Sequence, residues 1–224
     1  MQEIYTQAQA ESAVSTNKVL KNTYMLLALT MAVSAIACGI SMAIGLGRGT
    51  ALIMNLAAIA MVWFVLPRTA NSASGIYVVF GFTALLGASL GPTISYYLST
   101  ANGSQIVMQA LAGTALVFFG LSGYVLTTKK DFSFMRGFLV TGLIVVLLCA
   151  LGVMVAGFFG VNISGASLAI SAAIVFLMSG FILFDTSRIV NGGETNYVMA
   201  TVSLYLNIYN LFVALLHLIG AADD

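Results

Sequence analysis

The chain has 224 residues, of which 60% are hydrophobic and 7% are charged, and its formal net charge is +1. Soluble domains carry about 25% charged residues, so this chain lacks the charges needed to cover a water-facing surface. The composition therefore predicts an integral membrane protein, and the near-zero net charge leaves no basic footprint for nucleic acid.

Seven apolar segments follow a polar N-terminal segment. Residues 1–22 are rich in Gln, Glu, Ser, Thr and Asn, which predicts a disordered cytoplasmic tail. A helix needs about 20 apolar residues to cross the hydrocarbon core of a bilayer. Residues 23–224 are therefore predicted to form one transmembrane domain, and its second span, the shortest, is expected to end at Pro67. The predicted spans are Thr23–Ile44, Gly49–Leu66, Ile76–Leu98, Gln105–Thr127, Gly137–Phe159, Ala166–Ser187 and Tyr197–Ile219.

The distribution of basic residues predicts the orientation of these spans. Cytoplasmic connections of membrane proteins carry an excess of Lys and Arg. A cytoplasmic N-terminus leaves Arg48 as the one basic residue outside, and an odd number of spans places the C-terminal Asp224 outside as well. The basic residues then expected inside are Lys18, Lys21, Arg68, Lys129, Lys130, Arg136 and Arg188.

The third predicted span carries small residues at intervals of four. Gly87, Gly91 and Ser95 share one helix face, and Pro92 directly follows Gly91. Small residues with this spacing let two helices approach closely in lipid. We therefore expect Gly87 and Gly91 to pack against another helix and Pro92 to kink the span, with a gating hinge as the alternative.

The sixth predicted span contains Asp185, the one acidic residue inside the apolar segments. A carboxylate at the centre of a bilayer costs about 3 kcal/mol on insertion scales, so it is expected to have a partner or a role. Arg188 follows one turn later and can pair with Asp185. Asn207 lies about ten residues into the next span, or ~15 Å along it, so it meets Asp185 only if Asp185 lies deeper than predicted.

The seventh predicted span carries a polar stripe along one helix face. Such a stripe in lipid turns toward other helices or toward a water-filled cavity. Two interpretations stay open: hydrogen bonds between helices, or an ion or proton pathway that includes Asp185, Arg188, Ser203, Asn207 and Asn210. The stripe recurs in alternating steps of four and three, at Asn196, Ala200, Ser203, Asn207, Asn210, Ala214 and His217.

The sequence contains no recognisable catalytic motif. Gly120-Leu-Ser-Gly123 is similar to the serine motif of rhomboid proteases, but a serine nucleophile needs a base within hydrogen-bond reach. The predicted topology separates Ser122 from His217, the single histidine, by ~20 Å or more. Cys38 and Cys149 lie alone in apolar segments and are expected to behave as small hydrophobes. We therefore expect no enzyme activity, no cofactor and no metal site.

Several stretches resemble the Bax inhibitor-1 family of seven-span membrane proteins, and within that family the bacterial YccA subgroup. Together they extend from about residue 15 to the end of the chain. The matching stretches are Asn17–Tyr24, Leu90–Pro92, Gly113–Phe119, Tyr124–Phe134, Gly192–Tyr197 and Ala200–Tyr205, continuing to Tyr209 and Asn210.

The resemblance implies a bundle with six helices around a central seventh, in the inner membrane of a bacterium. It also implies a modulator, inhibitor and slow substrate of the ATP-dependent membrane protease FtsH. In calcium-leak members of the family, two aspartates on the sixth and seventh spans form a pH-sensitive pair. Asp185 matches the first of these positions, and Asn207 stands at the second. Because hard cations favour several carboxylate ligands, the alternative function, a H⁺ or Ca²⁺ leak, is expected to be weak.

Overall fold

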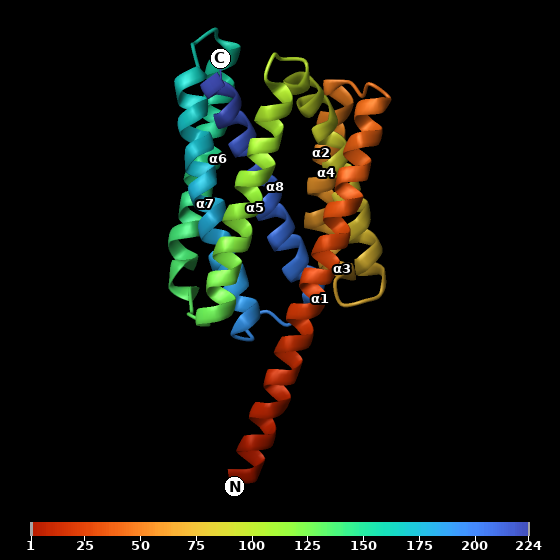
Figure 1. Cartoon of the computed structure of the whole chain (residues 1–224), viewed down its shortest axis with the longest axis vertical. Helices are drawn as coiled ribbons and strands as arrows, with labels where there is room; N and C mark the ends of the chain where they lie inside the picture. Colours follow the sequence, from red (N-terminus) through yellow and green to blue (C-terminus); the bar gives the residue numbers. More distant parts are fainter. Residues whose placement is uncertain (1, 224) are drawn as a thin grey trace. The chain divides into compact units, whose positions relative to one another are not determined.

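The computed structural model describes the backbone of residues 2–223 and the side chains of residues 14 and 16–223. Every regular element in this part of the chain is a helix (Figure 1). The longer helices are α1 (Gln2–Ala43), α2 (Arg48–Ala60), α4 (Ser74–Leu98), α5 (Gly103–Thr128), α6 (Arg136–Phe158), α7 (Ser164–Val190) and α8 (Tyr197–Asp223). Shorter elements are the π-helical turn η1 (Met61–Val65), α3 (Leu66–Thr69) and the 3-10 turn η2 (Ser133–Met135).

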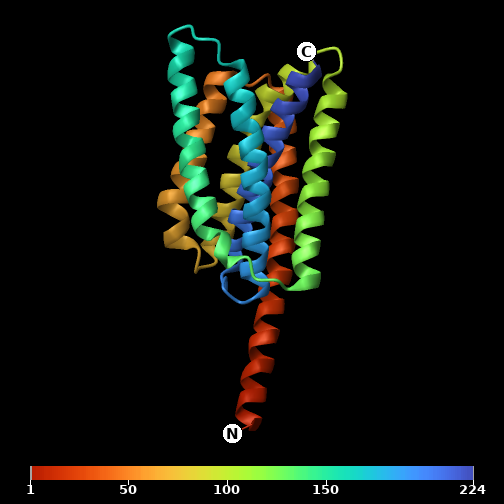
Figure 2. The same ribbon diagram turned by 90° about the vertical axis from the view of Figure 1, so that its left-hand side faces the viewer.

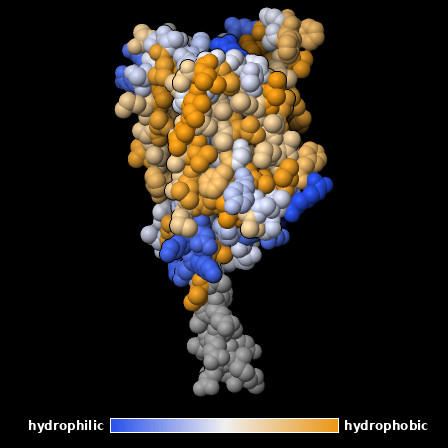
Figure 3. Space-filling model, turned by 90° about the vertical axis from the view of Figure 1, so that its right-hand side faces the viewer, coloured by the Kyte–Doolittle hydropathy of each residue, from blue (hydrophilic) through white to orange (hydrophobic). Residues whose placement is uncertain are grey.

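Seven helical segments are long and apolar enough to cross a membrane. They confirm the predicted all-α, seven-span fold, and most of their ends lie within a few residues of the prediction. On the face shown in Figure 3, apolar side chains form a broad band and hydrophilic side chains gather beyond it. The segments are Thr16–Ala43, Arg48–Thr69, Ser74–Leu98, Gly103–Thr128, Ser133–Phe158, Ser164–Val190 and Tyr197–Asp223.

The N-terminal segment differs from the sequence prediction. Because α1 begins at Gln2, the backbone of residues 2–22 is helical rather than irregular (Figures 1 and 2). The Glu, Gln and Ala residues of this segment are good helix formers, and extending an existing helix is much easier than nucleating a new one. Residue 22 is therefore not a break in secondary structure, while the division into a tail and a membrane domain stays a prediction. The side chains of residues 1–13 lie outside the described part.

The second span does not end at Pro67. The helix passes through Pro67 and ends at Thr69, after the π-helical turn η1. In this turn the N–H of Leu66 donates to the carbonyl of Met61, one residue further back than in an α-helix. Proline removes a backbone donor, and its ring collides with the preceding turn of a regular helix. A wider turn directly before Pro67 accommodates the ring, so the span continues.

The chain divides into two compact units. Unit 1 consists of Met1–Ala101 and Gly192–Tyr205, and unit 2 consists of Asn102–Asn191 and Leu206–Asp224. Residues 197–205 of α8 thus belong to unit 1, and the remainder of α8 belongs to unit 2. In unit 1, α4 packs against α1 and α2; in unit 2, α7 packs against α5 and α6.

Small residues allow the close packing of α4 against α1. A Cβ atom on Gly87 would collide with the backbone of Ser34, and one on Gly91 would collide with the side chain of Ser41. Gly87 and Gly91 thus lie at a close approach of α4 to α1. Pro92 follows inside α4, which continues to Leu98.

Substitution of Gly87 by Ala is expected to lower the free energy of unfolding by about 1–3 kcal/mol, because the added methyl group overpacks a backbone contact. The matched control is Gly39→Ala on α1, where a Cβ atom would meet nothing within 4 Å. This control should leave stability unchanged or raise it, since Ala favours helices more than Gly does. Thermal unfolding of both variants in detergent measures the difference. Equal melting temperatures would show that α1 and α4 separate easily.

Candidate functional site

The structure brings Asp185 of α7 and Asn207 of α8 together inside unit 2. The Nδ2 atom of Asn207 donates a hydrogen bond of 2.7 Å to Oδ2 of Asp185. Asp185 is 9% exposed and Asn207 is 7% exposed, so the carboxylate and the amide meet away from the surface. A buried carboxylate needs such a partner, because an unpaired charge in a low-dielectric interior is strongly destabilised.

The ends of the helices explain why the sequence left this contact undecided. The predicted sixth span ended at Ser187, but α7 continues to Val190 before the chain turns. Asp185 therefore lies deeper within its helix than predicted, as the contact with Asn207 requires.

The next residue of α7, Thr186, is also buried, and its Oγ1 lies 3.3 Å from Oγ of Ser122 on α5.

Arg188 contacts an aromatic ring on its own helix. Its guanidinium carbon lies 5.7 Å from the ring centroid of Phe184, one turn earlier on α7. A guanidinium over a ring face is attracted by the ring's electron density, which helps to hold a cation near the end of an apolar helix. The ion pair of Arg188 with Asp185 stays a prediction.

The polar stripe of α8 makes hydrogen bonds to other elements at several points. Oδ1 of Asn196 accepts hydrogen bonds from the backbone N–H groups of Val198 and Met199 at the start of α8. Its Nδ2 donates a hydrogen bond of 2.8 Å to Oδ1 of Asn71. At the other end of the stripe, Nδ1 of His217 lies 2.8 Å from Oγ of Ser171. These contacts favour the first interpretation of the stripe, hydrogen bonding between helices.

Ser203 and Asn210, the other members of the predicted pathway, lie in different surroundings. Ser203 is half-buried in the part of α8 that belongs to unit 1. Asn210 is exposed, and its Nδ2 donates to the carbonyl of Leu206 on the same helix at 2.8 Å. The amide of Asn210 is thus partly satisfied within α8 itself.

Ser122 and His217, the pair weighed as a possible protease dyad, have different partners. Ser122 contacts Thr186 at 3.3 Å, whereas His217 contacts Ser171 at 2.8 Å. Across the described residues, no group of three or more His, Cys, Asp or Glu side chains is arranged to hold a metal ion. With one carboxylate and one amide, the Asp185–Asn207 pair supplies few of the six to eight oxygen ligands that Ca²⁺ takes.

Sequence reasoning missed a second buried polar contact, around Tyr205 in unit 1. The Tyr205 hydroxyl lies 2.7 Å from Oγ of Ser34 on α1 and 3.4 Å from the carbonyl oxygen of Thr83 on α4. The ring of Phe82 meets the Tyr205 ring edge-on, with centroids 5.5 Å apart. Tyr205 lies two residues before the stripe position Asn207, so a pattern confined to one helix face did not include it.

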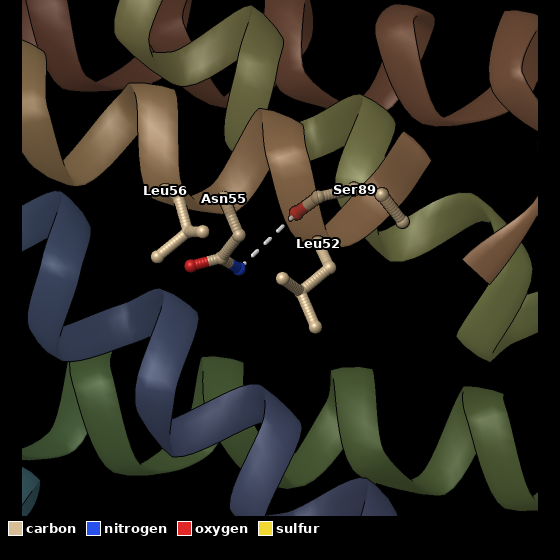
Figure 4. Close-up of a pocket in the computed structure, with 5 residues that line it drawn as sticks. Leu52, Asn55, Leu56 and Ser89 are labelled. Atoms are coloured by element: carbon tan, nitrogen blue, oxygen red, sulfur yellow. Dashed lines mark hydrogen bonds between the residues drawn. The ribbon is translucent and has the colours of Figure 1, made fainter. Parts of the chain in front are cut away.

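A groove of about 310 Å³ lies along α2 and α4 in unit 1 (Figure 4). Two of its polar lining residues meet where Nδ2 of Asn55 lies 3.5 Å from Oγ of Ser89. At this distance the hydrogen bond is weak. The lining is otherwise apolar and contains no charged side chain; it consists of Ala51, Leu52, Asn55, Leu56 and Ser89.

The seven apolar helices and the buried Asp185–Asn207 pair define a multi-pass α-helical membrane protein with a polar contact inside its bundle. The chain belongs to the family described as inhibitor of apoptosis-promoting Bax1, whose model matches residues 16–224. This assignment confirms the resemblance to the Bax inhibitor-1 family that the sequence motifs indicated.

Individual relatives match over almost the whole chain. An uncharacterized membrane protein of Vibrio cholerae is 52% identical, covering 96% of this chain and 94% of its own length. The modulator of FtsH protease YccA of Escherichia coli K12 is 49% identical, covering 95% of this chain and 94% of its own length. An uncharacterized protein of Pseudomonas aeruginosa is 45% identical, covering 97% of this chain and 98% of its own length.

Proposed function

We propose that this protein modulates an ATP-dependent membrane protease of the FtsH type by direct association, acting as an inhibitor and a slow substrate. The observation that carries the proposal is the similarity to the E. coli modulator of FtsH protease YccA. The two chains are 49% identical, and the match covers 95% of one and 94% of the other.

Two structural features support this role. The N-terminal part of α1 runs beyond α2, α3 and α4 of its own unit, and an unfolding motor could engage such a segment (Figures 1 and 2). Behind it, α1 packs closely on α4 at Gly87 and Gly91. Pulling α1 out of this contact requires many packed side chains to separate, which would slow extraction.

Affinity purification of the full-length protein from mildly solubilised bacterial membranes tests the association. An FtsH-type protease is expected among the co-purified proteins, identified by mass, and an unrelated seven-span protein with the same tag should not retain it. Raising the level of this protein should also lengthen the lifetime of other membrane substrates of the protease. Failure of both results would overturn the proposed function.

The orientation that this function requires is a cytoplasmic N-terminus in the bacterial inner membrane. Seven basic residues against one support it, since cytoplasmic connections are enriched in Lys and Arg. A reporter enzyme that works only outside the cytoplasm is expected to be active when it is fused after Asp224. The same reporter fused at the N-terminus should be inactive, as expected for a cytoplasmic position. A cytoplasmic reporter signal at Asp224 would contradict seven spans with this orientation.

The alternative function is a pH-sensitive proton or cation leak through Asp185 and the polar face of α8. The Asp185–Asn207 contact argues against strong Ca²⁺ conduction, because an amide replaces one of two carboxylates. Two adjacent carboxylates would share a proton and attract a divalent cation, and one carboxylate bonded to an amide does so much less. Protease modulation is therefore the better supported function.

A further inference from the structure

The connection between α5 and α6, taken together with the first residue of α6, carries three basic residues close together in the chain: Lys129, Lys130 and Arg136. None of the three forms an ion pair with another described residue. The one acidic residue among them, Asp131, accepts hydrogen bonds from the backbone N–H and the hydroxyl of Ser133 through Oδ1. These bonds hold the pKa of Asp131 below its usual value, so its carboxylate stays charged and offsets one of the three cations. We propose that this connection binds the phosphate headgroup of an anionic phospholipid.

Lys129 has a backbone conformation that normally selects glycine. Its φ of 52° and ψ of 24° are left-handed, and its N–H donates to the carbonyl of Val125 to close the last turn of α5. The other left-handed positions in the described chain are occupied by glycine, at Gly45, Gly160 and Gly192. A side chain in this conformation is strained, and glycine is the usual residue at such a helix end. A lysine here places a cation at the connection at a cost in local stability.

Arg136 also occupies a locally unfavourable position. It is the first residue of α6 and directly follows η2. Its own N–H donates to the carbonyl of Ser133, but it lies near the N-terminal end of the helix, where the helix dipole is positive. A cation there is repelled, and acidic residues are the favoured ones. Because the positive-inside rule counts charges over a whole connection, it accounts for the number of cations but not for these two positions. Residues that break local rules mark functional sites more often than other positions.

A buried serine holds the connection in place against α7. Oγ of Ser187, which is 1% exposed, accepts a hydrogen bond of 2.9 Å from the N–H of Phe132. The same hydroxyl lies 3.2 Å from the carbonyl oxygen of Lys130. The backbone next to Lys130 is therefore held in place without a ligand. Such preorganisation lowers the conformational-entropy cost of binding.

Aromatic side chains beside the cations indicate a lipid rather than a soluble ligand. The amine of Lys130 lies 5.6 Å from the ring centroid of Tyr124, which contacts Phe132, which in turn contacts Phe134. The hydroxyl of Tyr124 raises the pKa of Lys130, so the amine stays charged at neutral pH. Phe134 is 80% exposed. The connection lies between the apolar segments that end at Thr128 and begin at Ser133, which is the level of the headgroups, where aromatic residues anchor proteins.

The test compares lipid binding by two triple variants of the full-length protein. The site variant is Lys129→Gln, Lys130→Gln and Arg136→Gln; the control is Lys18→Gln, Lys21→Gln and Arg68→Gln, which removes the same charge from the same predicted side. Native mass spectrometry measures retention of phosphatidylglycerol relative to phosphatidylethanolamine. The site variant is expected to lose this selectivity by about fivefold for each cation removed. Equal losses in both variants would overturn the proposal, because overall charge would then explain the binding.

Two further measurements separate the possible ligands and the possibility of misfolding. Inorganic phosphate at millimolar concentration should not displace the lipid; displacement would indicate a soluble anion and overturn the proposal. Unchanged lipid selectivity in the site variant, with loss of an acidic protein partner, would overturn it in favour of a protein interface. Lys129→Gly relieves the left-handed strain, so its melting temperature should be unchanged or higher while selectivity falls about fivefold. Full selectivity in this folded variant would exclude a role for Lys129.

Discussion

Deletion of residues 2–15 is expected to lengthen the lifetime of the protein several-fold beside an FtsH-type protease, and to convert a slow substrate into a persistent inhibitor. An unfolding motor needs a segment that it can engage, and the N-terminal part of α1 extends beyond the helices of its own unit (Figure 1). The first apolar segment begins at Thr16, so the truncated chain should keep its seven spans. Pulse-chase measurement of both forms in cells with the active protease gives the ratio of lifetimes.

A matched control replaces residues 2–15 with a Gly-Ser stretch of the same length. If the protease needs only an accessible segment that it can engage, this flexible replacement should restore degradation, since an unfolding motor can engage an unstructured chain. If the helix itself is recognised, the replacement should stay as long-lived as the truncated form. Equal turnover of the full-length, truncated and replaced proteins would show that the protease does not engage this end of the chain.

Asn207→Asp is expected to produce a pH-dependent Ca²⁺ flux in reconstituted liposomes that the original protein shows only weakly. The substitution places a second carboxylate at the 2.7 Å contact with Asp185. Two carboxylates at this distance cannot both remain charged without a proton or a cation between them, so they titrate as a coupled pair. Flux should therefore change with pH across the range in which this pair exchanges its proton.

Asp185→Asn provides the opposite change at the same site. It keeps the shape of the side chain and removes the charge, so any cation flux through this pair should be lost, with a modest effect on stability. The modulation of the protease should remain. Asp131→Asn removes a carboxylate outside the apolar segments and should leave flux unchanged. A strong Ca²⁺ leak in the original protein, unaltered by Asn207→Asp, would show that ion conduction is the main function.

Two local features of the fold departed from the sequence prediction for identifiable reasons. Pro67 is a helix-stopping residue, but the π-helical turn before it gives its ring room, so the span reaches Thr69. Residues 2–22 are too polar to form a core, and this composition predicted disorder; however, composition does not include the effect of an adjoining helix. In both cases the deciding interaction lies in a neighbouring turn of the chain.

The sequence by itself determined the membrane class and the seven spans, and it predicted a packing face at Gly87 and Gly91 and a polar stripe on the seventh span. These properties depend on hydropathy and periodicity over stretches of about 20 residues, which are local and can be counted. Only the tertiary structure decided which polar side chains meet: Asn207 with Asp185, His217 with Ser171, and Tyr205 with Ser34. Such contacts depend on where each helix ends and how it is rotated against its neighbour, and those quantities are set by packing between segments far apart in the chain.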